Sequence, residues 1–357
     1  MLISDAIFCR LLLAWYDSHK RDLPWRTTRH RNDRPDPYHV LVSETMLQQT
    51  QVATVIPYFH RFIARFPTLK ALASADEQDV LRLWQGLGYY SRARNLHATA
   101  KIVVSRLAGR IPCTVEQLLA LPGIGRYTAG AVASIAFNTQ APIVDGNIMR
   151  VLCRLEKIES DPRTTVIGRQ LWKRAEELVP TARAGDFNSA MMELGSTICT
   201  PRAPKCLVCP VRTACRAQAA GLAERIPPAA KPIKRARHRR WTFAIEREGK
   251  FLIEQRPAQG RWASLWQFVT LEAQRRRPTA QDVLGATGLS VDDVRHIGRI
   301  EHALTHLDYE FTLYLARCSI RQPCTGNGRV WVAPAELENY PLPRPHLRMA
   351  QMLVELT

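Results

Sequence analysis

A glycine-rich turn followed by a run of small residues constrains the fold more than any other stretch of this chain. Residues 121–125 read LPGIG, and small residues recur at helical length up to residue 137. The two glycines permit positive φ and let another backbone approach closely. With a helix expected over 114–121, the pattern predicts a helix-hairpin-helix. Bare N–H groups in such a hairpin suit a phosphate, although the pattern alone fits an ordinary αα-hairpin equally well.

The charge balance indicates the kind of partner. The chain has 357 residues and carries 50 Lys and Arg against 32 Asp and Glu, a formal net charge of +18. This length allows two or three domains. With 46% hydrophobic residues, the charge indicates a folded protein that binds a polyanion, most simply nucleic acid. No stretch approaches the length of a membrane span, so we expect no membrane association.

Two acidic residues are candidates for acid–base chemistry. Glu44 lies among apolar residues of a predicted helix, where it is either a solvated residue or a buried acid with a raised pKa. Local sequence alone favours the solvated side chain. Asp145 precedes a helix expected over 148–157, and an N-cap position keeps a carboxylate ionised. A protonated acid facing a fixed anion is the pairing that glycosidic cleavage needs.

A dense group of cysteines indicates a metal site. Four of the nine cysteines lie within residues 199–215 with the spacing C-x6-C-x2-C-x5-C. Such spacing allows either a zinc site with four cysteine ligands or a [4Fe–4S] cluster. The four are Cys199, Cys206, Cys209 and Cys215. We expect ordinary free thiols at Cys9, Cys113, Cys153, Cys318 and Cys324.

The composition changes after residue 225. Residues 226–240 contain three prolines, six Lys or Arg and no acid, which is typical of a linker attracted to phosphate. Beyond it, alternating apolar residues predict strands, with a hairpin over 241–257 and a closing helix over 345–356.

Five stretches taken in order carry a family resemblance. VSETMLQQTQV, GLGYYSRARNL, LPGIGRYTAGA, VDGNIMRV and the cysteine array resemble the MutY family of adenine DNA glycosylases, in the helix-hairpin-helix superfamily with the endonuclease-III-like enzymes. The resemblance is close over residues 5–225 and looser beyond. It implies an all-α helix-hairpin-helix core with an iron–sulfur cluster loop and a C-terminal α+β Nudix-like (MutT-like) domain. The implied divisions are a six-helix domain at 29–137, a cluster domain from 1–28 and 138–225, the basic Pro-rich linker at 226–240, and a lesion-recognition domain at 241–357.

The resemblance also implies an activity. Such enzymes hydrolyse the N-glycosidic bond of adenine mispaired with 8-oxoguanine or guanine in duplex DNA, in base excision repair. Glu44 would protonate the adenine, Asp145 would stabilise the oxocarbenium ion, and Tyr127 would hydrogen-bond within the pair. Bifunctional relatives carry a lysine nucleophile where this chain has Tyr127, which predicts a monofunctional reaction. The alternatives are a bifunctional glycosylase/lyase acting on oxidised pyrimidines and a non-catalytic iron–sulfur DNA-binding protein.

Ligand and DNA contacts follow from the same resemblance. The four clustered cysteines would hold one [4Fe–4S] cluster, with the intervening basic loop facing the phosphate backbone, and the hairpin could hold a monovalent or divalent cation. Gln49 and Tyr89 match residues that wedge into the base stack. The expected DNA and base contacts are Trp25, Arg26, Leu47, Gln48, Gln49, Tyr89, Gly123, Gly125, Asn147, Ser189, Leu304, Thr305 and His306. We expect a monomer that is located in the cytoplasm and associated with the nucleoid.

Four features depart from the patterns of the related families. Ser189 stands where relatives commonly carry a longer Gln or Glu, and the insert at 30–35 is longer than usual. The loop Leu304-Thr305-His306 replaces Phe-Ser-His, so it keeps a hydroxyl and an imidazole but loses an aromatic wedge. The Nudix catalytic box is absent, so we do not expect nucleotide hydrolysis, which needs carboxylates for Mg²⁺.

Overall fold

The computed structural model describes residues 3–26, 34–229, 235–318 and 328–355, and the chain forms two compact units. The helical unit comprises Met1–Ser74 and Asn95–Lys231, and the sheet unit comprises Ala75–Arg94 and Pro232–Thr357. The segment Ala75–Arg94 therefore belongs with the C-terminal part, whereas we had expected it inside a domain at 29–137. Among the described residues, no helix combines the length and apolarity that a membrane crossing requires.

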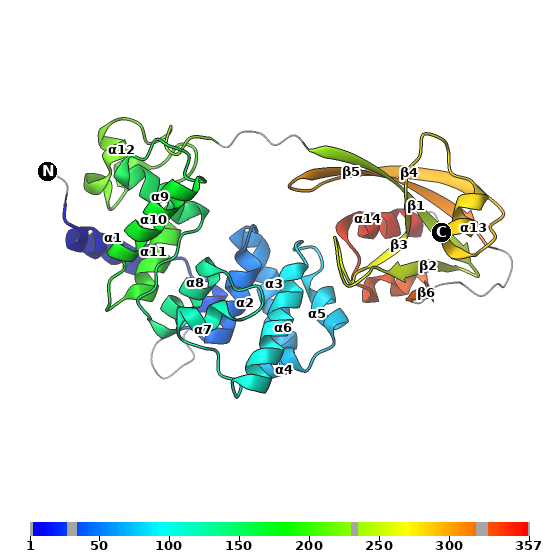
Figure 1. Ribbon diagram of the computed structural model, residues 1–357, viewed down its shortest axis with the longest axis horizontal. Helices are drawn as coiled ribbons and strands as arrows, with labels where there is room; N and C mark the ends of the chain where they lie inside the picture. The colour runs from blue at the N-terminus through cyan, green and yellow to red at the C-terminus, as the bar shows by residue number, and fades with distance from the viewer. Residues whose placement is uncertain (1–2, 27–33, 230–234, 319–327, 356–357) are drawn as a thin grey trace. The chain divides into compact units, whose positions relative to one another are not determined.

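The helical unit is all-α, as the sequence predicted (Figure 1). Its longer helices are α1 (Asp5–His19), α2 (Pro37–Leu47), α3 (Val52–Arg65), α6 (Ser91–Arg106, which enters this unit at Asn95), α8 (Arg126–Phe137), α9 (Gly146–Glu156), α10 (Thr165–Leu178) and α11 (Ala184–Thr197). The short turns of helix are η1 (Pro24–Arg26), α4 (Leu69–Ala73), α7 (Val115–Leu119), η2 (Cys206–Val208), η3 (Arg212–Ala214) and α12 (Arg216–Ala219).

Helix α8 lies at the centre of this unit because its side chains are small. It packs against α2 and α11, and α11 in turn packs against α1 and α9. A Cβ on Gly130 would lie 2.4 Å from the carbonyl oxygen of Pro142, and one on Gly185 would lie 2.5 Å from that of Ser134. Only glycine permits these approaches, so the run of small residues sets how closely the helices around α8 can pack.

The predicted helix-hairpin-helix is present, formed by α7, the turn at 121–125 and α8. Gly123 has a left-handed φ of +72°, and a Cβ there would meet the side chain of Asn95 at 2.4 Å. Gly125 differs from the expectation: its φ is −89°, and a Cβ there would meet nothing within 4 Å. The turn therefore needs one left-handed residue, and the second glycine leaves open space above the start of α8.

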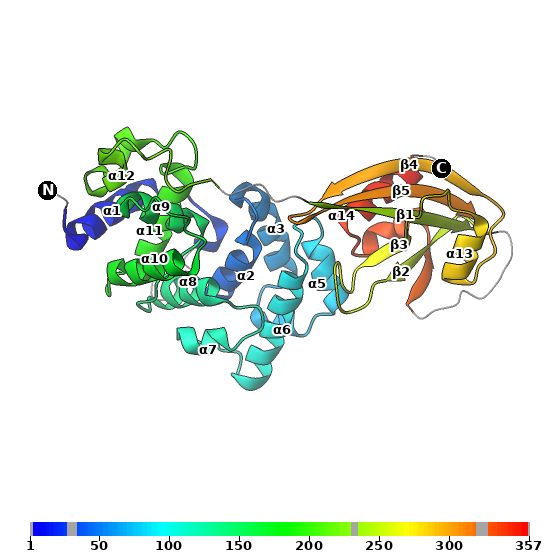
Figure 2. The same cartoon turned by 45° about the horizontal axis from the view of Figure 1, so that its top comes forward.

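The sheet unit contains a mixed six-stranded sheet with helices on both faces (Figures 1 and 2). The strand order is β4-β5-β1-β3-β2-β6, and within the described residues only β1 and β5 pair in parallel. The predicted hairpin is confirmed, because Glu246 pairs with Phe251 across a turn between β1 and β2. The elements are α5 (Glu77–Trp84), β1 (Ala236–Arg247), β2 (Lys250–Gln255), β3 (Trp266–Glu272), α13 (Ala280–Thr287), β4 (Val294–Ala303), β5 (Leu307–Arg317), β6 (Arg329–Val332), η4 (Pro334–Asn339) and α14 (Arg344–Val354).

Alternation along the strands gives the sheet two apolar faces. Phe251, Phe268 and Phe311 form one cluster with Met349 and Leu353 of α14. The other face holds a second cluster, in which Val283 of α13 packs with Trp241, Phe243, Val269 and Leu289. A sheet covered on both faces is an α+β layer structure, as expected for this part of the chain.

The linker is shorter than predicted. Strand β1 begins at Ala236 and takes in residues 236–240, because these residues pair with β5 from Ala236 opposite Leu307 onward. Residues 230–234 of the predicted linker, residues 30–33 of the insert and Cys324 lie outside the described residues.

Gly130→Ala should destabilise the protein by about 1–3 kcal/mol, because the added methyl group overpacks α8 against Pro142. The matched control is Gly168→Ala in α10. Its added Cβ would lie 3.9 Å from the nearest atom, so this substitution should stabilise the protein by roughly 0.5–1 kcal/mol. Urea unfolding followed by circular dichroism measures both. Equal effects of the two substitutions would contradict the close packing.

Candidate active site and cysteine cluster

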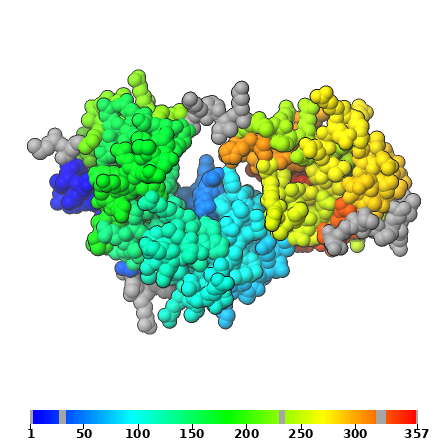
Figure 3. Space-filling view, viewed as in Figure 1, coloured from blue at the N-terminus to red at the C-terminus, as the bar shows by residue number. Residues whose placement is uncertain are grey.

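A cavity of about 970 Å³ opens in the helical unit between α2, α8, α9 and α11. In Figure 3 the blue atoms of the α2–α3 region lie recessed beside the green atoms of the later helices. The structure brings together in its lining ten of the residues predicted from the sequence: Trp25, Arg26, Glu44, Leu47, Gln48, Gln49, Tyr127, Asp145, Asn147 and Ser189. Gly123 and Gly125 lie in the hairpin turn outside this lining, and the remaining predicted contacts belong to the sheet unit.

Glu44 is buried, with 4% of its surface exposed, so the solvated side chain that local sequence favoured is wrong. Helix α2 starts at Pro37 after the N-cap Asp36, and residue 38 and residues 40–46 are buried, so the helix is enclosed on nearly every face. Burial raises the pKa of the Glu44 carboxyl to about 7, against the lowering effect of a hydrogen bond from Tyr127. A carboxyl with this pKa can hold a proton near neutral pH and release it during a reaction.

Tyr127 lies directly against this acid. Its hydroxyl donates to Oε2 of Glu44 at 2.8 Å and lies 3.1 Å from the sulfur of Met192. The residue occupies the first turn of α8, immediately after the hairpin, so the turn fixes where the ring enters the cavity. Burial, and then the charge of Glu44, raise the pKa of the Tyr127 hydroxyl, so it remains a donor.

Asp145 caps helix α9, as predicted. Its carboxylate accepts hydrogen bonds from the Ile148 N–H at 2.7 Å and from the Asn147 amide at 3.0 Å. We expected the helix N-terminus to dominate its ionisation, yet burial outweighs these bonds and raises the pKa above its usual value. The pKa is raised because a carboxyl inside a cavity loses the hydration that an exposed N-cap carboxyl retains.

Sequence reasoning missed a buried ion pair beside this site. Glu193 is 1% exposed and accepts hydrogen bonds from Arg21 and from Arg26, the latter at 2.9 Å. Burial opposes its ionisation, but the two guanidinium groups lower the pKa of Glu193 below its ordinary value. A signal was available, because Glu193 stands four residues after Ser189 and therefore shares its face of α11.

Four further residues that we predicted as DNA or base contacts lie in different parts of the cavity lining. Trp25 is buried in η1, where its ring makes a T-shaped contact with Phe59, and Ser189 is buried in α11. The amide of Gln48 donates to the Thr128 hydroxyl at 3.2 Å. Gln49 follows in the break between α2 and α3, is exposed, and has a left-handed φ of +57°. A positive φ is uncommon in a non-glycine residue and indicates a conformation that the surrounding structure imposes.

The N-terminus of α8 is open to a ligand. No side chain caps its first turn, in contrast to α9, capped by Asp145, and α7, capped by Thr114. Gly125 at the cap adds no side chain, and Gly125 and Arg126 are exposed. Uncapped N–H groups at a helix start attract anions.

The four clustered cysteines face one small cavity, together with Arg154. Nη1 of Arg154 donates to the sulfur of Cys199 at 3.2 Å, and the residue is 2% exposed. Among the described residues, no three His, Cys, Asp or Glu side chains converge as ligands of one metal ion.

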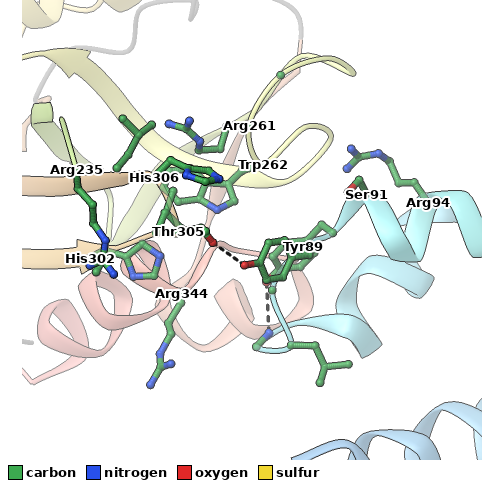
Figure 4. Close-up of a pocket in the computed structure, with 18 residues that line it drawn as sticks. Tyr89, Ser91, Arg94, Arg235, Arg261, Trp262, His302, Thr305, His306 and Arg344 are labelled. Atoms are coloured by element: carbon green, nitrogen blue, oxygen red, sulfur yellow. Dashed lines mark hydrogen bonds between the residues drawn. The ribbon is translucent and has the colours of Figure 1, made fainter. Parts of the chain in front are cut away.

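The sheet unit holds the predicted loop, which connects β4 and β5 (Figure 4). Leu304, Thr305 and His306 line a pocket together with Tyr89, and the Tyr89 and Thr305 hydroxyls lie 2.7 Å apart. Tyr89 is 46% exposed and, like Gln49, has a left-handed φ, of +48°.

The opposite face of the sheet lacks a magnesium site among its described residues. Helix α13 contains one acidic residue, Asp282, whose carboxylate pairs with Arg276 at 2.5 Å. A single carboxylate held by arginine cannot supply the oxygen ligands that Mg²⁺ needs.

Family models match both units. Residues 42–177 match the HhH-GPD superfamily of base excision DNA repair proteins, and residues 240–352 match the NUDIX domain. Two solved structures share the helical fold. A thermostable thymine-DNA glycosylase has a TM-score of 0.54 and 30% identity, covering 60% of this chain and 97% of that one. An endonuclease III–DNA complex has a TM-score of 0.50 and 21% identity, covering 62% of this chain and 99% of that one. The fold and the site therefore define a DNA glycosylase of base excision repair, which is an enzyme.

Curated relatives narrow the class. The adenine DNA glycosylase of Rattus norvegicus is 39% identical over 93% of this chain and 75% of its own length, and that of Homo sapiens is 41% identical over 85% and 65%. The Buchnera aphidicola enzyme is 33% identical over 95% of both chains. The chain belongs to the adenine DNA glycosylase family, which confirms the resemblance and the fold class drawn from the sequence.

Tyr127→Phe should raise the pKa of Glu44 above its value of about 7, because the hydroxyl that stabilises the carboxylate is removed. Infrared difference spectroscopy of the carboxyl stretch across a pH series measures the shift. Glu44→Gln serves as the control that identifies the band. A pKa that falls or stays constant would contradict the role of this hydrogen bond.

Proposed function

We propose that this protein hydrolyses the N-glycosidic bond of adenine mispaired with 8-oxoguanine or guanine in duplex DNA, as a monofunctional enzyme. The observation that carries the proposal is the buried Glu44 carboxyl, whose pKa is raised to about 7 and which shares a cavity with Asp145. Adenine within a duplex cannot reach a cavity in the protein, so the nucleotide must rotate out of the stack at a cost of a few kcal/mol.

Glu44 is the proton donor in this mechanism. The acid transfers its proton to N7 of the adenine, and the bond between C1′ and N9 then breaks with its electron pair passing to the base. Tyr127 stabilises the Glu44 carboxylate that this transfer leaves, because its hydroxyl already donates to Oε2.

Asp145 stabilises the sugar cation. Positive charge builds up at C1′ as the base departs, and a carboxylate in the same cavity lowers the energy of that ion. Asn147 and the Ile148 N–H fix the Asp145 carboxylate through the hydrogen bonds described above. Water then adds to C1′ and loses a proton to the carboxylate pair, which leaves free adenine and an abasic site.

The cavity supports hydrolysis without strand cleavage. Its lining in the described part of the chain contains no lysine, and Tyr127 stands where bifunctional relatives carry one. A Schiff base with the sugar needs an amine, so the lyase alternative lacks its nucleophile. The third alternative, a non-catalytic protein, leaves the buried acid Glu44 unexplained.

Duplex DNA is the proposed partner, bound at several places. The uncapped start of α8 with Gly123 and Gly125 binds one phosphate, and a cation at the hairpin would assist it. Gln49 enters the base stack from the cavity rim. In the sheet unit, Tyr89 and the loop at 304–306 contact the 8-oxoguanine. A monomer suits this asymmetric target. Binding to duplex DNA would place the protein with the nucleoid.

We assign one [4Fe–4S] cluster to the cysteine cavity. Cys199, Cys206, Cys209 and Cys215 would ligate the irons, and Arg154 would donate to the sulfur of Cys199 and offset the cluster's negative charge. The loop between these cysteines contains regular structure only as the short turns η2 and η3, so a bound cluster would brace it. That loop presents exposed Arg202, Lys205 and Arg212 for the phosphate backbone.

The decisive experiment incubates a duplex containing an 8-oxoguanine·A pair with the protein and resolves the products with and without alkali. We expect strand breaks only after alkali, since an abasic site survives until base treatment. Glu44→Gln and Asp145→Asn should each reduce adenine release by at least about 10³-fold while duplex binding is retained.

Glu176→Gln is the matched control, because this exposed residue of α10 undergoes the same chemical change and should release adenine at the unaltered rate. Nicking without alkali would support the lyase, and wild-type protein that releases no base would support the non-catalytic alternative. Full activity in Glu44→Gln would refute its role as the acid.

The double substitution Thr305→Ala with His306→Ala should erode the preference for 8-oxoguanine·A over G·A, because the loop loses its hydroxyl and imidazole. The ratio of single-turnover rates on the two duplexes measures the preference. Thr305→Ser keeps the hydroxyl and should retain it. An unchanged ratio in the double variant would place lesion reading elsewhere.

Cys206→Ser should lower the bound iron and sulfide and the associated visible absorbance, because a hydroxyl is a poor ligand for a cluster iron. Cys113→Ser, which removes an exposed thiol far along the chain from the array, is the control. Purified protein with zinc and without iron would contradict the assignment. Iron and sulfide analysis distinguishes the two outcomes without an activity measurement.

A further inference from the structure

Two neighbouring apolar side chains project into solvent from the cysteine loop of the helical unit. Leu207 is 85% exposed and Val208 is 66% exposed. Among the described residues they are the only exposed large hydrophobic residues that are adjacent in the chain. A single exposed apolar residue is ordinary, but a contiguous apolar surface indicates a place that a partner covers. We call this pair the apolar tip.

The backbone of the loop directs the apolar tip outward. Both residues lie in η2, and the N–H of Cys209 closes the turn by donating to the carbonyl of Cys206 at 3.3 Å. The side chains of these two cysteines line the small cavity described above. Because both ends of the turn face inward, the residues between them occupy its projecting side. Figures 1 and 2 show the segment between α11 and α12 at the periphery of the helical unit.

The loop that carries the apolar tip is purely cationic. From residue 195 to residue 223 the sequence contains four Lys or Arg and no Asp or Glu. Arg202 and Lys205 precede the tip, Arg212 follows it, and all three are exposed. Arg216 is instead held in an ion pair. A polyanion would therefore meet the tip without repulsion and would find cations on both sides of it.

Duplex DNA matches this surface better than a protein does. A standard protein interface buries about 800 Å² on each partner, far more than two aliphatic side chains can cover. The minor groove of DNA is a narrow slot, and proteins that bind it frequently insert leucine and other apolar side chains. Phosphates run along both edges of that slot, which suits an apolar tip with cations on either side.

We infer that Leu207 and Val208 enter the minor groove of duplex DNA. The exposed cations before and after the tip hold the phosphates at the edges of the groove. The inference rests on the proposed function only for duplex DNA as the partner, and it adds an apolar contact to the phosphate contacts of this loop. The contact is independent of sequence and of the lesion, because the sugars that the tip meets are the same at every nucleotide.

Salt separates the apolar tip from the cations that flank it. Each phosphate contact releases counterions, so the logarithm of the binding constant falls with the logarithm of the salt concentration, with a slope of about 0.9 for each contact. An apolar contact releases no counterions. Its loss therefore weakens binding by the same factor at every salt concentration.

The test measures Kd of the full-length protein for an undamaged duplex and for a duplex with a G·A mispair, by fluorescence anisotropy over a series of salt concentrations. Leu207→Ala should weaken binding to both duplexes roughly fivefold and Val208→Ala roughly threefold, because buried methyl and methylene groups are lost. The salt slope should stay constant in both variants. Arg212→Gln should instead reduce the slope by about 0.9.

Val166→Ala is the matched control for Val208→Ala. Val166 is 73% exposed in α10, outside the cysteine loop, so its truncation should change neither Kd nor the salt slope. Leu207→Gln keeps the length of the side chain without its apolarity and should weaken binding as Leu207→Ala does, whereas Leu207→Met should retain it. Bound iron and sulfide, measured in each variant, should equal those of the wild type.

A loss of affinity on both duplexes in Leu207→Ala and Leu207→Gln, with an unchanged salt slope, supports the inference. Unchanged affinity in these variants overturns it and leaves a protein as the occupant of the tip. An equal loss in Val166→Ala, or a loss confined to the mispaired duplex, also overturns it. Adenine release is assayed separately, and its absence in wild-type protein that binds both duplexes would overturn the proposed function alone.

Discussion

The burial of one carboxyl under one tyrosine is the constraint on which the rest of the helical unit depends. An ionised Glu44 in this position would be costly, so the cavity that desolvates it also keeps it protonated near neutral pH. Tyr127 limits that shift through its hydrogen bond and thereby keeps the pKa in a useful range. Acid strength is thus set jointly by α2, which buries the group, and α8, which supplies the donor.

The small residues of α8 connect this chemistry to the fold. Because Gly130 lets the chain near Pro142 approach closely, the segment that follows carries Asp145 to the same cavity as Glu44. The hairpin before α8 then leaves the helix start uncapped, directly beside Tyr127. In the proposed function, one helix therefore offers an uncapped end to a phosphate and the Tyr127 hydroxyl to Glu44, and a phosphate bound at the turn would orient the strand relative to the acid.

The fold class was predictable because its signals are periodic and local, as in the alternating apolar residues that predicted the hairpin of β1 and β2. The burial of individual side chains was not predictable, since whether Glu44 is solvated depends on helices that are distant in the sequence. The same limit explains Asp145, where the N-cap was evident but the desolvation that raises its pKa was hidden. Glu193 was missed because its partners Arg21 and Arg26 lie far away in the chain, although its spacing from Ser189 placed it on the correct face.

The segment Ala75–Arg94 has a consequence for anyone who divides this protein. Gln78 donates to the carbonyl of Ser264 and accepts from the indole of Trp266, so α5 is part of the sheet unit's packing although the sequence places it among the helices. A truncation at the linker would separate α5 from the strands that it contacts and leave the sheet unit incomplete. The boundary between the two units crosses the chain before Ala75 and after Arg94, as well as in the linker.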